Sequence, residues 1–588
     1  MKRLNLLISL VIVIPLLAAC STEKVVTQEV EKIVKETVVE TVVETVIETV
    51  VETVIETVVE TVIVEGTPEI VETTVEVIVT AVPEEQDTSK FGGTLVIQTA
   101  GMVQFDYALC ADDASWYVIS NVYSTLYRVN RDRSIFPDLA TSWEYEDDTT
   151  FILYLRKGVM WHDGNDVFPE GESREVVADD VVYSIQRGVD MDGSTLSAGF
   201  LAAFESVEAL DDYTVQVKLT KADALLISGS RGLGHIAVVP HEAVDHYGED
   251  FGMNPVGSGP FEFDEYKPDE YVRLVRNEDY WKRPYVDEVM FKVIPDEDAA
   301  LIAFETGEVD FLATVPEAEV ERLQDDTRFA LDTSGLECAP WIMFDMSVPL
   351  VQDQEFRQAL AFALDAEGIS MNIERSMYAG GCGIAGKGVP GHDPNLCKYF
   401  PYDPEGALEL LAGIGWEDSD GDGVLDKDGE QMEFQMEIWN MDPMPRYGEA
   451  IVIQLQEIGI PAELQTVEFG TWIDDLFAGP GKAMMGSGFC TDGGLNGVFG
   501  REAATSVAMG YDMPGVHDTL DEANITIDPG QRDNMLREAQ ETLFSQYLAV
   551  PMRHSTGYFG TRSWVHDFPG LFWTADICTE QNNVWVTK

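Results

Sequence analysis

Residues 137–144 are Pro-Asp-Leu-Ala-Thr-Ser-Trp-Glu, and residues 155–164 are Leu-Arg-Lys-Gly-Val-Met-Trp-His-Asp-Gly. Each stretch carries one tryptophan, Trp143 or Trp161, and we expect both rings to pack in a core because they bury a large apolar area. In the stretch 254–261, glycines on either side of Ser258 suit a tight turn. Further short stretches of this kind follow in order at 178–184, 276–281, 307–310, 356–360 and 402–405.

Taken in that order, these stretches resemble the extracellular solute-binding protein family 5, the oligopeptide-, dipeptide- and nickel-binding class of ABC-transporter receptors. The resemblance covers residues 91 to about 570. Two departures are the insertion at 165–177 and Gly-Ser-Gly at 257–259, where the family has Gly-Thr-Gly. The resemblance implies an α/β, periplasmic-binding-protein-like fold of type II, class C, with two lobes and an extra subdomain.

The family layout also implies a discontinuous first lobe. Lobe I is expected to contain residues 91–130, 255–335 and 550–588, subdomain II residues 131–254, and lobe III residues 336–549. The local pattern suits an α/β or an α+β chain, with a Gly-led apolar strand at 91–97 and an amphipathic helix that begins near Asp179. Two more amphipathic helices are predicted over 356–369 and 405–414, the second with Pro404 in its first turn.

The N-terminus predicts a secretory signal. Lys2 and Arg3 precede an uncharged, mostly apolar run at 6–19, which is too short for a spanning helix. The run ends in Leu-Ala-Ala-Cys at 17–20, which resembles a bacterial lipobox. We therefore expect residues 1–20 to be a lipoprotein signal peptide, with Cys20 lipidated and the protein anchored on the outer, extracytoplasmic side of a cell membrane.

A low-complexity Glu/Thr/Val stalk is predicted at 21–90. From Glu36 to Glu60 a Glu recurs every four residues, with Thr-Val-Val or Thr-Val-Ile between. The period is close to that of a helix, yet Val, Ile and Thr prefer strands and glutamates four apart repel one another in a helix. A helix, a coiled coil and an extended stalk therefore all remain open.

The chain is strongly acidic, with 105 Asp and Glu against 37 Lys and Arg, a formal net charge of −68 and a pI near 4.1. This balance argues against nucleic acid and against docking on anionic lipid, since both need basic patches. Cationic or neutral solutes are favoured over anionic ones. Acidity alone also keeps a protein soluble, so the solute stays open.

Six cysteines besides Cys20 form no CxxC pair, which argues against a zinc knuckle. An even count in an exported chain favours disulfides, and six cysteines allow fifteen pairings. The resemblance implies one pair, Cys338–Cys490. Proximity and the family layout then leave two more pairs, Cys382–Cys397 and Cys110–Cys578.

Sequence motifs for catalysis are weak. His241 and His246 are five residues apart and would not share a helix face as in a zinc protease, and residues 381–386 fit G-x-G-x-x-G without a predicted strand before them. The segment 418–426 is more specific, because alternating carboxylates before a glycine suit a calcium loop. We expect structural Ca²⁺ there, with a solvated acidic turn as the alternative; the ligands would be Asp418, Asp420, Asp422, Val424 and Asp426.

Residues 488–492, Gly-Phe-Cys-Thr-Asp, resemble the W-C-A-D-Y stretch of oligopeptide receptors, although Gly493 stands where the family has Tyr. The resemblance implies that Asp492 meets the α-ammonium of a peptide, a charge that needs a partner once it is desolvated. Phe489, Trp341 and Tyr123 are expected from family position to be aromatic walls.

We thus expect a monomeric, non-enzymatic receptor that captures a peptide or similar solute and delivers it to an ABC permease. An oligosaccharide, nickel or haem are alternative solutes. A stalked hydrolase or adhesin is the alternative from another class. A hydrolase would need a catalytic constellation, and an adhesin would not need the ordered receptor stretches.

Overall fold

The computed structural model describes residues 51–64, 67–80 and 88–588, apart from gaps at 103, 111, 131–132, 169–172, 193, 195–202, 228–231, 487–492 and 571–573. The chain divides into two compact units, Met1–Asp87 and Thr88–Lys588. In the first unit, β1 (Val51–Val64) and β2 (Thr67–Thr80) form an antiparallel hairpin in which Val51 lies opposite Thr80. Strand, rather than helix, is therefore the conformation of this part of the repeat, in line with the β preference of Val, Ile and Thr.

The second unit begins with a mixed eight-stranded sheet that defines lobe I. Its strand order is β10-β11-β12-β3-β13-β23-β14, and β16 also pairs with β23. Only the β12–β3 and β13–β3 pairings are parallel among those of this sheet. The strands are β3 (Thr94–Thr99), β10 (Phe261–Lys267), β11 (Tyr271–Arg276), β12 (Glu288–Val293), β13 (Phe311–Leu312), β14 (Phe329–Cys338), β16 (Tyr378–Gly380) and β23 (His554–Arg562).

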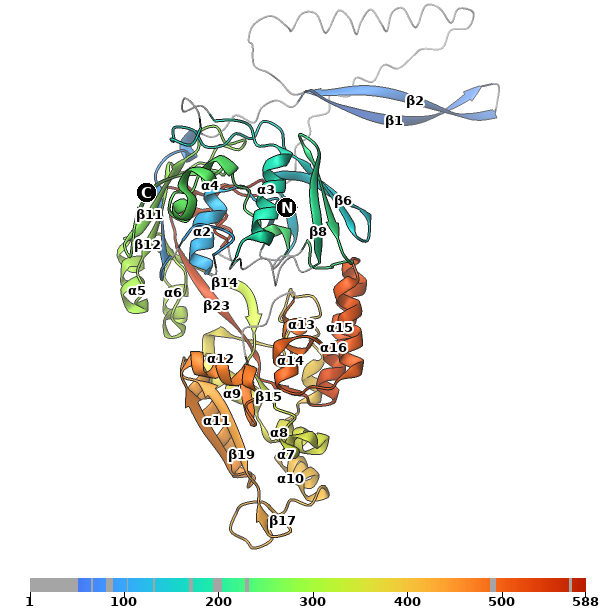
Figure 1. Ribbon diagram of the computed structural model, residues 1–588, viewed down its shortest axis with the longest axis vertical. Helices are drawn as coiled ribbons and strands as arrows, with labels where there is room; N and C mark the ends of the chain where they lie inside the picture. The colour runs from blue at the N-terminus through green and yellow to red at the C-terminus, as the bar shows by residue number, and fades with distance from the viewer. Residues whose placement is uncertain are drawn as a thin grey trace, which may run out of the picture. The chain divides into compact units, whose positions relative to one another are not determined.

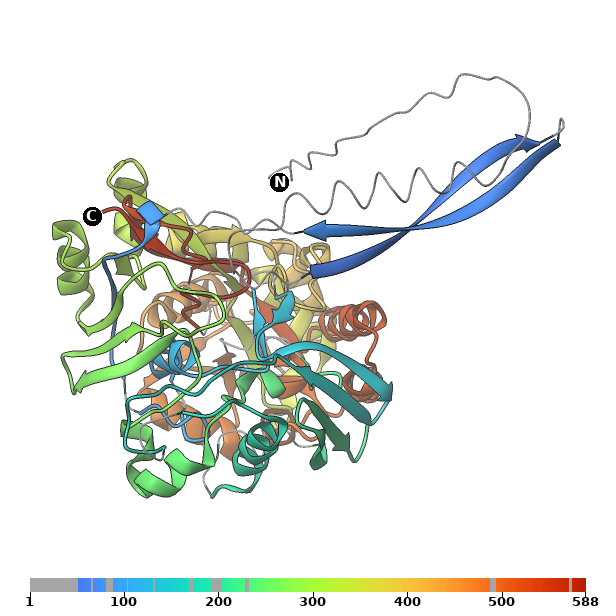
Figure 2. The ribbon, with the colours of Figure 1, turned by 90° about the horizontal axis from the view of Figure 1, so that it is seen from above.

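Subdomain II contains a four-stranded antiparallel sheet of order β6-β7-β9-β8. Helix α2 lies between this sheet and that of lobe I (Figures 1 and 2), and one continuous core joins the two parts. The elements are α2 (Asp113–Val122), β4 (Tyr127–Val129), β5 (Ile135–Pro137), β6 (Ala140–Asp147), β7 (Thr150–Leu155), α3 (Ala178–Asp190), β8 (Phe204–Asp211), β9 (Thr214–Leu219) and α4 (His241–Tyr247). Lobe I adds α5 (Glu297–Thr306), α6 (Val320–Gln324), β24 (Val565–His566) and β25 (Trp585–Val586).

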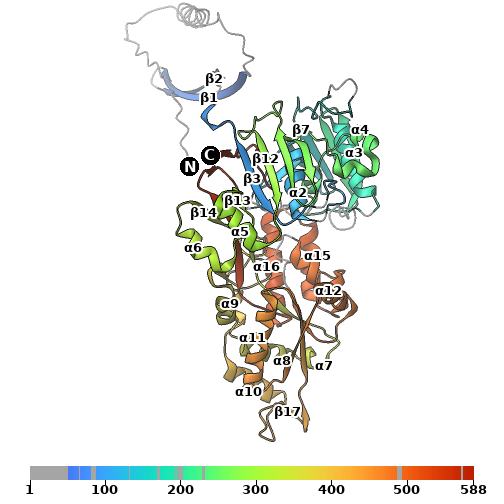
Figure 3. The ribbon, with the colours of Figure 1, turned by 90° about the vertical axis from the view of Figure 1, so that its left-hand side faces the viewer.

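Lobe III has its own five-stranded sheet, of order β20-β19-β21-β15-β22, and its own core. Figure 3 shows its helices α8, α10 and α11 below lobe I, with β17 at the far end. The strands are β15 (Trp341–Phe344), β17 (Asp426–Lys427), β18 (Glu430–Gln431), β19 (Phe434–Trp439), β20 (Ala462–Val467), β21 (Ala483–Gly486) and β22 (Ala549–Pro551). The helices are α7 (Pro349–Gln352), α8 (Gln354–Ala363), α9 (Ala366–Glu374), α10 (Pro404–Gly413), α11 (Met444–Glu457), α12 (Phe469–Ala478), α13 (Gly494–Phe499), α14 (Ala504–Ala508), α15 (Pro514–Ile525) and α16 (Pro529–Ser545).

Two neighbouring strands cross between the lobes (Figures 1 and 3). β14 continues into β15 through residues 339–340, and β22 continues into β23 through residues 552–553. The two links are joined by a hydrogen bond in which Met552 N donates to Pro340 O at 2.8 Å. The lobes are thus connected by a narrow pair of strands, an arrangement that permits hinge motion.

The predicted single helix over 356–369 is wrong, because the structure has two helices there. α8 ends at Ala363, and α9 begins at Ala366 after Asp365, whose carboxylate accepts a hydrogen bond from Gly368 N at 2.8 Å. An aspartate that satisfies a free N–H at a helix start is a common N-cap, and here it begins a second helix. The predicted helices at Asp179 and Pro404 are present as α3 and α10.

Candidate functional site

The carboxyl ends of three strands meet at one edge of the lobe III sheet. β20 and β21 both run parallel to β19, so Trp439, Val467 and Gly486 end their strands on the same side. In open α/β sheets ligands bind outside the carboxyl ends of the strands. This edge is therefore the first place in lobe III to look for a binding surface.

An aromatic cluster occupies that edge, formed by Trp439, Phe469 and Trp472. The ring centroids of Trp439 and Trp472 are 4.6 Å apart, and the Phe469 ring stacks on Trp472 at 5.9 Å with 15° between the planes. Trp472 is buried, whereas Phe469 is 42% exposed. The cluster therefore presents one open ring on a rigid aromatic base, a surface suited to an apolar or planar group. Sequence reasoning missed this cluster, because Trp439 at the end of β19 lies thirty residues before Phe469 at the start of α12.

Of the predicted ligand residues, Asp492 and Phe489 lie outside the described residues. Trp341 pairs with Gly486, the last described residue before 487–492. A Cβ on Gly486 would lie 2.9 Å from the Trp341 ring, so the ring covers the backbone at that point. Trp341 is only 1% exposed, so it supports the edge from within the core and is not an open wall in this structure.

Tyr123 belongs to the other core and is not brought together with Trp341. It follows the last turn of α2, is fully buried, and its ring centroid lies 6.4 Å from that of Phe251. Burial, followed by the negative charge of Asp106, raises the pKa of the Tyr123 hydroxyl well above its usual value. Its hydroxyl has no hydrogen-bond partner among the described residues.

Asp106 itself is neutralised by Arg187. The guanidinium donates to both carboxylate oxygens, at 2.8 and 2.5 Å, and lies 5.5 Å from the ring centroid of Tyr107 and 5.3 Å from that of Phe251. A buried, bidentate ion pair between aromatic rings is rigid and has its charge satisfied. We interpret it as a support for the lobe I side rather than as a ligand contact.

The predicted calcium loop gathers part of its ligand set. Three exposed carboxylates lie with oxygens within 4.8 Å of one another: those of Asp418, Asp420 and Asp422. Asp426 is buried instead, and its carboxylate accepts from Ser419 N and Oγ. The backbone N of Val424 donates to Asp422 at 2.9 Å, which closes the turn. The structure thus places three of the five predicted ligands together and gives Asp426 another partner.

A second group with metal-ligand side chains is occupied by an arginine. Asp180, His241 and Glu242 lie close together, but Arg174 donates to both carboxylates at 2.7–2.8 Å. Its positive charge takes the position that a cation would need. His246 is not part of the group among the described residues.

A disulfide joins Cys382 and Cys397 inside the 381–397 segment, so the G-x-G-x-x-G stretch is part of a cross-linked loop. Cys338 is also disulfide-bonded, and its predicted partner Cys490 lies outside the described residues. The identity of the Cys338 partner therefore stays a prediction.

The predicted Cys110–Cys578 disulfide is wrong, since both residues are buried thiols in the structure. Cys110 Sγ lies 3.3 Å from Asp112 O at the start of α2, whereas Asn121, at the other end, donates to Ala575 O. Cys578 Sγ lies 3.2 Å from Lys282 O, so the two sulfurs contact different backbone carbonyls.

Comparison with known proteins gives the family directly. Residues 134–493 match the profile of the bacterial extracellular solute-binding proteins, family 5, middle region. The chain belongs to this family. Its fold is accordingly that of the two-lobed periplasmic binding proteins, as the sequence predicts.

Curated relatives of this solute-binding protein are binding proteins rather than enzymes. The oligopeptide-binding protein AppA of Bacillus subtilis is 30% identical over 66% of this chain and 71% of its own length. The haem-binding protein A of Haemophilus influenzae is 29% identical over 82% of this chain and 90% of its own length.

Solved structures show the same fold at lower identity. The ABC transporter-associated periplasmic binding protein DppA of Helicobacter pylori, in complex with the peptide STSA, has a TM-score of 0.66 at 23% identity, over 86% of this chain and all of its own. HbpA2 of Haemophilus parasuis has a TM-score of 0.70 at 24% identity, over 84% of this chain and all of its own. Among the described residues of this solute-binding protein, no helix has the length and apolar character to cross a bilayer.

Proposed function

We propose that this solute-binding protein captures a peptide or a similar small solute between lobes I and III and delivers it to an ABC permease, without covalent chemistry. The observation that carries the proposal is the aromatic cluster at the carboxyl edge of the lobe III sheet, with the open Phe469 ring at the edge where β19, β20 and β21 end. Family relatives that bind oligopeptides or peptides support this class of solute. The net charge of −68 favours a cationic or neutral solute.

Asp492 is proposed to pair with the α-ammonium of the peptide, on the strength of the W-C-A-D-Y resemblance. A carboxylate that pairs with a desolvated ammonium contributes strongly, because its removal leaves the ammonium unpaired. Asp492→Asn should therefore weaken peptide binding by about 2–5 kcal/mol. Calorimetry with a free peptide and with its N-acetylated form measures this: the loss should appear with the free peptide and vanish with the acetylated one.

The solute class is tested by a calorimetric screen of wild-type protein with di- to nonapeptides, oligosaccharides, haem and Ni²⁺–histidine. Haem and nickel enter the screen because relatives that bind them share the fold. We expect saturable binding of peptides. Binding of one of the other classes, with none of peptides, would overturn the peptide assignment.

The aromatic cluster is tested with two phenylalanines of the same helix. Phe469 lies at the start of α12 and Phe477 near its end, and both are more than 40% exposed. Phe469→Ala should lower solute affinity about tenfold through lost ring contact, whereas Phe477→Ala should leave it unchanged. Equal effects of the two changes would contradict a role for the cluster.

Anchoring is proposed at Cys20, with residues 21–90 as a spacer that keeps the receptor near its permease. A tether raises the effective concentration of receptor at the transporter when the spacer spans the gap. The repeated Glu residues of the spacer would also discourage contact with anionic lipid. Mass spectrometry of the membrane-extracted protein should find a diacylated N-terminal Cys20; an unmodified thiol would exclude the anchor.

Structural Ca²⁺ is proposed at the 418–426 loop, with Asp418, Asp420 and Asp422 as carboxylate ligands. Oxygen ligands of this kind suit a hard cation, and exposure of all three leaves a modest affinity. Calorimetry with millimolar Ca²⁺ should show uptake that Asp420→Asn weakens, with the solute affinity unchanged. If wild-type protein takes up no Ca²⁺, the loop is a solvated acidic turn and not a calcium site.

A further inference from the structure

The crossing strands β14 and β23 offer two places where the lobes could pivot. One is the pair of links at 339–340 and 552–553. The other is an irregularity inside the β14–β23 ladder: Thr333 pairs with Tyr558 and Glu337 pairs with Thr556, so residues 334–336 lie opposite the single residue Gly557. Extra residues in one strand interrupt the regular register and let the ladder bend.

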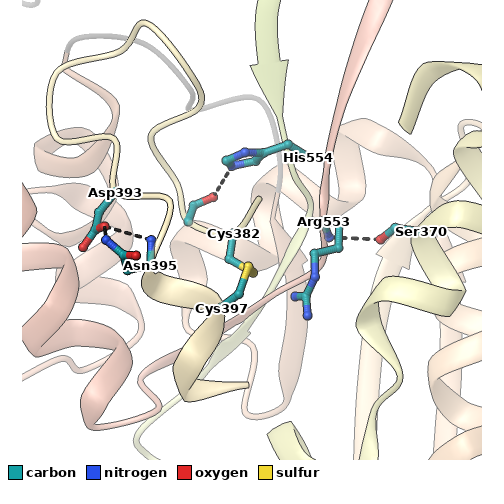
Figure 4. The surroundings of a disulfide bond; sticks show 8 residues. Ser370, Cys382, Asp393, Asn395, Cys397, Arg553 and His554 are labelled. Atoms are coloured by element: carbon teal, nitrogen blue, oxygen red, sulfur yellow. Dashed lines mark hydrogen bonds between the residues drawn. A yellow bond between two sulfur atoms is a disulfide. The ribbon is translucent and has the colours of Figure 1, made fainter. Parts of the chain in front are cut away.

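A disulfide-closed loop, residues 381–397, lies against the lobe III ends of both strands. On β14, a Cβ added to Gly386 would lie 1.8 Å from Glu337 O, so the two backbones are in direct contact. On β23, the ring of His554 lies 2.9 Å from Gly383 O through Nε2, as Figure 4 shows. Burial lowers the pKa of His554 to about 4, so the ring is neutral and Nε2 donates this bond.

The same loop is fixed to the body of lobe III. Gln540 of α16 accepts hydrogen bonds from Ile384 N at 2.9 Å and Ala385 N at 3.2 Å, and donates to Gly391 O at 2.5 Å. The Cys382–Cys397 disulfide closes the loop, and Cys382 is fully buried in lobe III.

The chain stretch that forms lobe III, 341–551, also supplies β16, which pairs with β23 as an added strand of the lobe I sheet. Gly380 of β16 pairs with His554, and Tyr378 pairs with Ser555. Arg553 N donates to Ser370 Oγ of α9 at 3.0 Å (Figure 4). Residues 553–555 are therefore attached to lobe III on more than one side.

We infer that the 381–397 loop is a brace that fastens residues 337–338 and 554–555 to lobe III, so that the lobes rotate about the irregularity at 334–336 and Gly557 rather than about the links. A ladder bends more readily at a register shift than where its pairing is regular, and a glycine at that point absorbs changes in φ and ψ. The links, by contrast, lie between the brace and the lobe III sheet. The inference rests on the proposed function only in that capture needs rotation of the lobes.

Hydrogen–deuterium exchange of the full, oxidised chain without any solute locates the pivot. Amides of 334–336 and Gly557 should exchange fastest, while those of 338, 339, 341 and 552–555 stay protected. Fast exchange at the links together with a protected irregularity would overturn the inference. Because no solute is added, this outcome is independent of what the protein binds.

Two variants test the brace itself. Cys382→Ser/Cys397→Ser opens the loop, and Gly386→Ala pushes it away from Glu337 with the disulfide intact. Each should raise amide exchange at 337–338 and 554–555 at least tenfold and leave β11 and β12 unchanged. Gly413→Ala, at a position with open space around the added Cβ, is the matched control and should change nothing.

Unchanged exchange at 337–338 and 554–555 in a folded Gly386→Ala protein would overturn the brace. An increase in amide exchange that is spread evenly over lobe III in both variants would also overturn the brace. Such a pattern is expected of a loop that only stabilises the lobe.

Discussion

His162 and His554 are buried imidazoles that the structure holds in the neutral form. His162 Nε2 donates to Gly259 O at 3.0 Å, while Nδ1 accepts from Gly257 N at 3.4 Å. Only a neutral ring both donates and accepts in this way. Burial is the main cause that lowers the pKa of each histidine to about 4.

These histidines predict a loss of stability in mild acid. In the unfolded chain these two histidines bind protons near pH 6.5, whereas in the folded chain they bind them only near pH 4. The free energy of unfolding therefore rises with pH between pH 4 and pH 6.5, and this contribution is constant below pH 4. A pKa difference of this size corresponds to about 3 kcal/mol per histidine between pH 7 and pH 4. His162→Gln, whose amide keeps a donor and an acceptor, should lose about 3 kcal/mol less over that range.

Urea denaturation of both proteins at several pH values measures this difference, and the comparison cancels the carboxylates that also titrate. The same pH dependence in wild-type protein and variant would show that His162 does not titrate as proposed.

Residue-level predictions succeeded where chemistry is local. Cys382 and Cys397 lie fifteen residues apart in one loop, and the structure joins them. The pair Cys110–Cys578 failed, because whether two cysteines so far apart in sequence meet depends on the tertiary fold. The open ring of Phe469 was also out of reach, since its exposure depends on how α12 packs on β19.

At the scale of elements, the turn at 256–259 packs directly on the end of α2. A Cβ on Gly257 would lie 1.9 Å from Val122 O, and one on Gly259 would lie 2.6 Å from Asn121 O. Gly259 N donates to Val122 O at 2.9 Å, which satisfies a carbonyl at the helix end. The sequence indicated a tight turn here, but its requirement for close backbone contact appears only in the fold.

Gly257→Ala should therefore destabilise the protein by about 3 kcal/mol, because backbone on both sides leaves no flexible atom to move aside. Gly101→Ala is the matched control in the same lobe, since no atom lies within 4 Å of the added Cβ. Thermal unfolding of the two variants measures the effect. A Gly257→Ala protein as stable as the control would mean that the turn shifts freely.

Element boundaries were predictable where a side chain caps the backbone. The carboxylate of Asp180 accepts from Val177 N at the start of α3, and Asp403 accepts from Gly406 N at the start of α10. Asp365 does the same for α9, but it stands inside an apolar pattern that continues through α8, so periodicity hid the break. The strand order of lobe I was out of reach of local pattern, since β23 inserts between β13 and β14 from more than 200 residues away.

At the scale of the whole molecule, a formal net charge of −68 opposes compaction. Raising NaCl from about 0.1 to 1 M shortens the screening length from about 10 to about 3 Å and weakens that repulsion. The melting temperature should therefore rise by several degrees in NaCl, and trehalose of equal osmolarity should give a smaller increase. A melting temperature that falls with NaCl would show that ion pairs outweigh the repulsion.

The position of β23 sets the order in which the chain can fold as it is made. The lobe III sheet and its helices come from one continuous stretch, 341–551, and are complete before the C-terminus leaves the ribosome. Lobe I lacks an inner strand until residues 554–562 emerge, so β13 and β14 border an unfilled position in the sheet while residues 339–553 are made. Such delayed long-range pairing is slow and leaves strand edges open. The nascent protein therefore carries an incomplete lobe I throughout the synthesis of lobe III.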